Sequence, residues 1–326
     1  MTGKKRTLLL LAVFLFSIAG FVGATEAADA WKPTKTITLI CAFNAGSVGD
    51  TFSRPFAEIM SKYAGVKVVV ENMGGGSGSI GTNYMLSQPA DGHIFSYHSN
   101  TGALNTAAGN APFGVDDVLP FANIGSDYHV ITVKTDSPFK TFKEFVEYAH
   151  ANPGKLNVGG AQIMGNNHLF TLLMFRDFNI DAAYVPYDDG AASVLGLLGG
   201  NVDCLMSTAS TVRAQINSGN FRALAYTMPE KVAEMGDVPT FKSLGSKGLA
   251  NYISFKGMFI SPKSSDAVKA WYDDIGYKVC HDPKWIEFLK LQGQENTYMG
   301  LAQFTKYYKQ YVAEAAEIFK TIPKSK

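Results

Sequence analysis

The chain has 326 residues, with 29 Lys or Arg against 28 Asp or Glu, so its formal net charge at pH 7 is +1. Nucleic acids and anionic membranes attract basic surfaces, and a nearly neutral chain is not expected to bind either as its main partner. The length is enough for two domains, each with an ordinary hydrophobic core.

The first thirty residues have the pattern of an export signal. Basic residues 4–6 precede an almost wholly apolar run, residues 8–22, and small residues follow. This run is short for a membrane span, which needs about 20 apolar residues, and no later segment is long enough either. The sequence therefore predicts a removable signal peptide, residues 1–30, and a mature protein in the periplasm.

From residue 36 onward, short apolar runs alternate with amphipathic stretches, a pattern typical of βα units and a mainly parallel sheet. Strands are expected at 37–43, 66–70 and 94–98. Between the first two strands, residues 51–63 have apolar side chains at helical spacing, with Asp50 as the expected N-cap. These segments form one complete βαβ unit.

A second alternating series begins after residue 121 and predicts another α/β lobe. Its expected strands are 130–133, 156–160, 182–186, 202–206 and 221–227, and its expected helices are 141–150, 166–178, 191–198 and 209–217. Two more helices, 266–279 and 301–322, are expected near the end of the chain. No linker-like segment separates the two lobes, which indicates strands that cross between them as a hinge.

A loop of small residues joins the first expected strand to the first expected helix. A helix N-terminus has unpaired N–H donors and partial positive charge, so this loop can hold a carboxylate without Lys or Arg. A tight βα turn with an Asp cap is the alternative interpretation. The candidate ligand-binding residues of this first loop are Phe43, Asn44, Ala45, Gly46, Ser47, Val48, Gly49 and Asp50.

Two loops of the second series have the same position, residues 159–168 and 187–191. Open α/β sheets bind ligands beyond the carboxyl ends of their strands, so the loops of the two lobes are expected to face one another across a cleft. His168 is of interest because it stands at the start of a helix at this cleft.

Other site motifs are weak or missing. A formal G-x-G-x-x-G occurs at Gly76, Gly78 and Gly81, but Met73 to Gly75 intervene before it, and no strand-end acid stands in the right context, although Asp91 lies roughly in range. The sequence contains no G-x-S-x-G, no H-E-x-x-H and no paired Cys or His spacing of a zinc site. No cofactor, no metal site and no enzymatic activity are therefore expected.

Several blocks of the sequence, taken in order, resemble the Bug-type extracytoplasmic receptors of tripartite tricarboxylate transporters. The match extends over essentially the whole mature chain, and its most specific part is residues 185–203. The other matching blocks are 42–50, 69–81, 89–93, 152–157, 165–168, 222–225 and 237–240.

This resemblance implies an α/β fold of the type II periplasmic-binding-protein kind, with two α/β lobes joined by a hinge of crossing strands. Lobe 1 would be discontinuous, residues 31–127 plus 252–326, and lobe 2 would be residues 128–251. It also implies a monomeric receptor that captures a small carboxylate and delivers it to the small and large membrane subunits of a transporter. The carboxylate could be a di- or tricarboxylate, an aromatic acid or a keto acid.

Further candidate contacts follow from the resemblance, position by position. Ser47 and Asn166 each add a side chain where the family usually has a smaller residue. Ser207 and Thr208 stand where some relatives have an acid that could hold an ammonium group, which argues against amino acid ligands. The candidates beyond the first loop are Ser99, Asn100, Thr101, Gln162, Met164, Gly165, Asn166, His168, Tyr187, Gly190, Ala191, Ser207 and Thr208.

Two other functions stay open at this point. An exported α/β enzyme that acts on a small acid would have the same fold class and location. A ligand sensor that presents its loaded form to a signalling protein would share the binding site as well.

Overall fold

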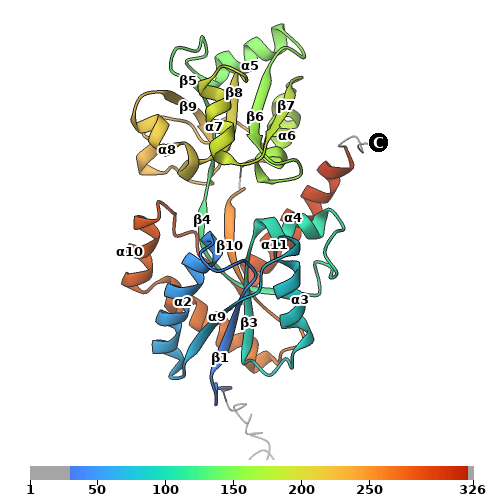
Figure 1. The fold of residues 1–326 in the computed structure, drawn as a ribbon, viewed down its shortest axis with the longest axis vertical. Helices are drawn as coiled ribbons and strands as arrows, with labels where there is room; N and C mark the ends of the chain where they lie inside the picture. Colours follow the sequence, from blue (N-terminus) through green and yellow to red (C-terminus); the bar gives the residue numbers. More distant parts are fainter. Residues whose placement is uncertain (1–29, 251, 322–326) are drawn as a thin grey trace, which may run out of the picture. The chain divides into compact units, whose positions relative to one another are not determined.

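The computed structural model describes residues 30–250 and 252–321, so the predicted export signal lies almost wholly outside the described residues. Residues from Lys32 onward form one compact unit. It is built on two β-sheets, each covered by helices (Figure 1). None of the helices in the described segments is both long and apolar enough to cross a membrane.

The first sheet has six strands in the order β11-β4-β10-β3-β1-β2. Its strands are β1 (Ile37–Cys41), β2 (Val68–Asn72), β3 (Ile94–Ser99), β4 (Leu119–Asp127), β10 (Ser254–Ile260) and β11 (Met299–Gly300). β1 is parallel to β2 and β3, whereas β10 is antiparallel to β3 and β4. We call this sheet and its helices the first lobe.

The second sheet has five strands in the order β7-β6-β8-β5-β9, and with its helices it forms the second lobe. Its strands are β5 (His129–Lys134), β6 (Asn157–Ala161), β7 (Ala183–Tyr187), β8 (Cys204–Thr208) and β9 (Phe221–Tyr226). β6 is parallel to β7 and β8, and β5 is antiparallel to β8 and β9.

Both sheets are mixed: most strands of each sheet run in one direction, as the prediction of a mainly parallel sheet requires, whereas β5, β10 and β11 run opposite to the others. The chain passes directly from β4 in the first sheet to β5 in the second and returns through β10. β5 and β10 enter their sheets from the edge at which the parallel strands end, so they run opposite to those strands. A parallel strand would need a longer crossover connection.

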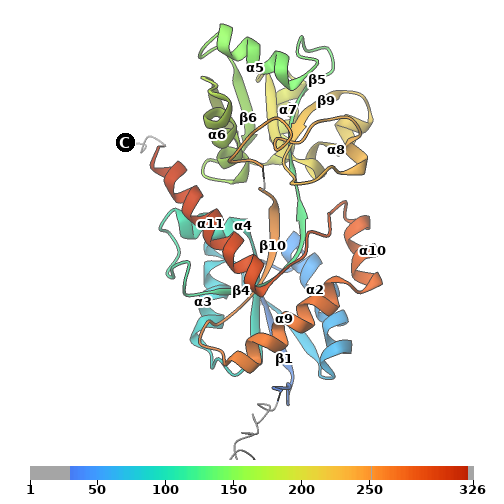
Figure 2. The same cartoon turned by 180° about the vertical axis from the view of Figure 1, so that it is seen from behind.

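Helices flank both sheets. In the first lobe they are α2 (Val48–Ala64), α3 (Ser79–Ser87), α4 (Asn100–Ala107), α9 (Asp266–Cys280), α10 (Pro283–Leu291) and α11 (Leu301–Lys320). In the second lobe they are α5 (Phe142–Ala151), α6 (Asn166–Phe178), α7 (Gly190–Leu198) and α8 (Ala209–Asn217). α11 packs on β4 and α4, and it also contacts α6 of the second lobe (Figure 2).

The helix predictions differ in accuracy. The bounds of α6 and α8 are confirmed at both ends. The start of α2 is corrected: the helix begins at Val48, and Ser47 is its N-cap because Ser47 Oγ accepts a 3.2 Å hydrogen bond from the Asp50 N–H. The short helices α3 and α4 were not predicted, because their small and polar residues show little apolar spacing.

Candidate functional site

The first loop, between β1 and α2, is shaped by the carboxylate of Asp50. Asp50 Oδ2 accepts hydrogen bonds of 3.0 Å from the Gly46 N–H and from Arg54 Nε, and Oδ1 accepts one of 3.0 Å from Asn72 Nδ2. Burial opposes ionisation, but these donors outweigh it and lower the pKa of Asp50 below its ordinary value of 3.8. The carboxylate is therefore ionised at neutral pH and holds the loop from inside.

The start of α2 keeps free donors at a fixed position. Within the described part of the chain, the N–H groups of Val48 and Gly49 donate no hydrogen bond. Gly49 lies so close to Phe43 of the same loop and to Tyr97 of β3 that an added Cβ would come within 2.6 Å of the Phe43 ring and 2.9 Å of the Tyr97 ring. The helix N-terminus is thus packed tightly against the sheet, with donors left for an anion.

The second loop, between β6 and α6, is closed in the same way. His168 Nδ1 accepts a 3.0 Å hydrogen bond from the N–H of Met164, four residues earlier, as Asp50 does from Gly46. Burial lowers the pKa of His168 to about 4, so the ring is neutral, and it stacks on Tyr184 with a centroid distance of 4.4 Å. The His168 ring therefore supports the loop as an acceptor and carries no positive charge at neutral pH.

The backbone of this second loop is strained. Gln162 and Met164 have φ angles of 57° and 58°, in the left-handed region that residues with a side chain rarely adopt. Such strain persists where the surrounding structure over-determines the backbone, and it concentrates at binding sites. The second loop is therefore a candidate site on its own geometry.

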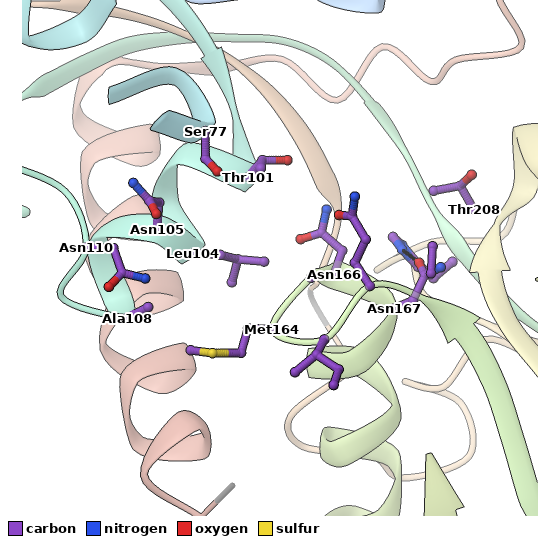
Figure 3. A pocket seen from close by; sticks show the side chains of 15 residues that line it. Ser77, Thr101, Leu104, Asn105, Ala108, Asn110, Met164, Asn166, Asn167 and Thr208 are labelled. Carbon is purple, nitrogen blue, oxygen red and sulfur yellow. Dashed lines mark hydrogen bonds between the residues drawn. The ribbon is translucent and has the colours of Figure 1, made fainter. Parts of the chain in front are cut away.

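A cavity of about 380 Å³ lies between the second loop and α4 (Figure 3). The first lobe lines it with Ser77, Thr101, Leu104, Asn105, Ala108 and Asn110. The second lobe lines it with His129, Ala161, Gln162, Ile163, Met164, Gly165, Asn166, Asn167 and Thr208. These residues include no Lys, Arg, Asp or Glu, and burial lowers the pKa of His129 to about 3. An anion in this cavity would be held by neutral donors alone.

The structure brings some of the predicted site residues to this cavity and leaves others beside it. Those that line it are Thr101, Gln162, Met164, Gly165, Asn166 and Thr208. Those that do not are the first loop, Ser99, Asn100, His168, Tyr187, Gly190, Ala191 and Ser207. Ser99 is instead the N-cap of α4, and the Tyr187 carbonyl accepts a 2.8 Å hydrogen bond from the Gln162 N–H.

Several lining residues were missed by the sequence analysis. Asn167 and Ile163 lie inside the predicted second loop, so their position next to Asn166 and Met164 was a usable signal. Ser77 belongs to the glycine-rich segment that resembled a dinucleotide motif. His129 had no signal, because its burial depends on both lobes.

Across residues 30–250 and 252–321, no three His, Cys, Asp or Glu side chains come together in an arrangement that could hold a metal ion. The three cysteines, Cys41, Cys204 and Cys280, are all buried and unpaired.

Two mixed α/β lobes joined by crossing strands, with a neutral polar cavity between them, define the class of two-lobed solute-binding proteins. Residues 52–323 match the family described as tripartite tricarboxylate transporter family receptor. The chain belongs to this family.

Individual relatives are similar over most of the chain. A UPF0065 protein of Bordetella pertussis is 29% identical over 285 residues, which cover 86% of this chain and 87% of the relative. A TctC solute binding protein from Polaromonas, solved with no ligand, has a TM-score of 0.83 at 21% identity and covers 89% of this chain and 99% of its own. An R. palustris protein solved with adipate has a TM-score of 0.67 at 21% identity and covers 89% and 97%. Both solved structures share the fold of this chain.

Proposed function

We propose that this chain is an exported receptor that captures a small carboxylate between its lobes and delivers it to the membrane subunits of a tripartite transporter. The observation that carries the proposal is the matched construction of the two loops. In the first loop the Asp50 carboxylate accepts a hydrogen bond from the Gly46 N–H, and in the second loop the His168 ring accepts one from the Met164 N–H. Each bond closes its loop in front of a helix N-terminus. Helix N-termini that face a cleft are anion sites.

The ligand would be an acid without an ammonium group. The cavity lining has donors from backbone and side-chain amides but no carboxylate that could balance a positive charge. Di- and tricarboxylates, aromatic acids and keto acids all fit this requirement. The adipate bound by the R. palustris protein of the same fold is one member of this class.

Ligand capture would require the lobes to close. In this proposal the crossings near residues 127 and 252 act as the hinge, with lobe 1 formed by residues 31–127 and 252–326. Closure would bring the first loop, Ser99, Asn100 and Tyr187–Ala191 to the ligand, although none of these lines the present cavity. The loaded, closed form would then be recognised by the two membrane subunits.

A thermal-shift screen tests the binding function. The full chain, expressed with its own N-terminus and purified from the periplasm, is heated with mono-, di-, tri- and aromatic carboxylates, amino acids, sugars and NAD. A ligand that binds only the native state raises the melting temperature. Once the protein is saturated, this rise grows with the logarithm of the ligand concentration. We expect such a rise with one class of carboxylate.

Two other outcomes contradict the proposal. Shifts produced only by sugars, amino acids or NAD would exclude a carboxylate receptor. Conversion of an added acid into a product would favour an exported enzyme. N-terminal sequencing of the purified protein tests export separately, with a start near residue 31 as the expected result.

A further inference from the structure

A network of buried polar side chains lies behind the cavity and joins the two lobes. It begins at the side-chain amide of Asn100, the first residue of α4. Asn100 is 4% exposed. Two chains of hydrogen bonds run from Asn100 Nδ2, and they end at Asn166 and Asn167, the first two residues of α6.

The first chain passes through the hinge strands. Asn100 Nδ2 lies 3.4 Å from Ser254 Oγ, which lies 3.4 Å from His129 Nδ1, and His129 Nε2 lies 2.9 Å from Asn167 Oδ1. An amide oxygen only accepts, so His129 Nε2 carries the hydrogen. His129 is fully buried and neutral, which leaves Nδ1 as an acceptor for the Ser254 hydroxyl.

The second chain passes through the last helix. Asn100 Nδ2 lies 3.4 Å from the hydroxyl oxygen of Tyr311, and the Tyr311 O–H donates a 2.9 Å hydrogen bond to Asn166 Oδ1. The hydrogens of both chains therefore point the same way, from Asn100 toward the oxygens of the two asparagines.

This direction decides what the cavity offers to a ligand. Each Oδ1 already accepts a hydrogen bond from behind the cavity, whereas neither Nδ2 has an acceptor among the described residues, so the unused donors of both asparagines are their Nδ2 groups. Asn167 is 8% exposed and lines the cavity beside Asn166, across from Thr101, Leu104 and Asn105 (Figure 3). No side chain caps α6 at Gly165, so the backbone donors of the helix start are added to the same wall.

We propose that Asn167, with Asn166 beside it, donates its side-chain N–H groups to the ligand carboxylate, and that His129 and Tyr311 are positioning residues that hold both amides in the donor orientation. This inference rests on the proposed function and specifies its second-lobe carboxylate site. It explains how a cavity without a charged side chain would select an anion, because the side-chain amides of Asn166 and Asn167 present N–H donors to it.

The orientation of the Asn167 side-chain amide is tested without any ligand. In ¹⁵N NMR spectra of the full chain at pH 7, we expect His129 to be the Nε2–H tautomer, with an unprotonated Nδ1. The Nδ1–H tautomer would reverse the hydrogen bonds and turn the Asn167 oxygen toward the cavity, which would overturn the proposal.

The role in binding is tested by calorimetry with adipate, citrate and benzoate as probes. Asn167→Asp keeps the shape of the side chain but replaces the donor by an anionic acceptor, and we expect affinity to fall by about tenfold to a hundredfold. Asn201→Asp adds the same charge on an exposed side chain between α7 and β8, and it is expected to leave affinity unchanged. Equal losses in both variants would indicate a general charge effect and contradict the assignment.

His129 is tested by two substitutions. His129→Gln retains an N–H donor close to Nε2, and affinity within about threefold of the wild type is expected. His129→Leu removes the donor, which frees Asn167 to rotate, and a loss of about tenfold is expected. If both variants bind equally, His129 has no positioning role. If the wild type binds none of the three probes, the proposed function fails, whereas wild-type binding that Asn167→Asp leaves unchanged refutes only this inference.

Discussion

The hydroxyl of Tyr311, in the last helix, donates a 2.9 Å hydrogen bond to Oδ1 of Asn166, at the start of α6. The two residues are 145 positions apart in the sequence and belong to different lobes. The second loop is therefore supported by the first lobe, and its geometry depends on how the two lobes are arranged.

Removal of this hydroxyl should weaken ligand binding as well as folding. In Tyr311→Phe, Asn166 loses its donor and can turn, so we expect carboxylate affinity to fall by about threefold to tenfold, with a loss of about 1 kcal/mol in unfolding free energy. Calorimetry and urea unfolding measure the two effects. Tyr277→Phe, at an exposed tyrosine of α9, is the control and should change neither. An unchanged affinity in Tyr311→Phe would show that the contact is only structural.

The tight packing at Gly49 predicts that even one methyl group displaces the first loop. An added Cβ would lie 2.6 Å from the Phe43 ring, closer than carbon atoms approach in folded proteins. We expect Gly49→Ala to lower the unfolding free energy by about 1–3 kcal/mol and to weaken carboxylate binding. Gly114→Ala is the matched control, because its nearest neighbour is a flexible Asp117 oxygen at 3.4 Å. Equal stability of the two variants would contradict the packing argument.

Asp50 should contribute stability at neutral pH that disappears in acid. Its folded-state pKa is lower than the ordinary 3.8, so the unfolded chain binds more protons as the pH falls. The contribution is complete above the unfolded-state pKa and is lost as the pH falls through the folded-state value. Urea midpoints of the wild type and Asp50→Asn should therefore differ most above about pH 5 and approach one another as the pH falls through the folded-state pKa. A difference that is constant from pH 6 to pH 3 would contradict this role.

Lys256 should be dispensable for folding at neutral pH. It is 7% exposed, and its ammonium contacts Gln294 Oε1 and the Phe52 ring, with no carboxylate oxygen within 4.0 Å among residues 30–250 and 252–321. Burial lowers the pKa of Lys256 to about 8, although the charge of Asp127 opposes the shift. We expect Lys256→Met to be as stable as the wild type at pH 7, or more stable by about 1–2 kcal/mol.

The pH dependence of this variant gives a second readout. The unfolded chain holds the Lys256 proton up to about pH 10, whereas the folded protein releases it near pH 8, so wild-type stability should rise relative to Lys256→Met between these values. Lys263→Met, at an exposed lysine, is the control and should follow the wild type. A large loss of stability in Lys256→Met at pH 7 would indicate that the ammonium is paired.

The sequence alone was sufficient for the parts of the fold that depend on local spacing. The helices α6 and α8 were predicted at their observed ends. The two loops before α2 and α6 were recognised because small residues between a strand and a helix mark a helix N-terminus. The sequence blocks that resemble the receptor family predicted the type of fold and the order of the two lobes along the chain.

Tertiary structure alone decided the direction of the crossing strands and the character of the cavity wall. β5 and β10 run against their parallel neighbours because the chain enters each sheet from the other lobe. The orientation of the Asn167 amide depends on His129, 38 residues away, and His129, which also contacts Ser254 of the first lobe, is neutral because it is buried. Periodicity in a sequence reports burial within one segment, whereas the orientation of an amide and the charge of a ring depend on atoms that only the complete fold brings within hydrogen-bonding distance.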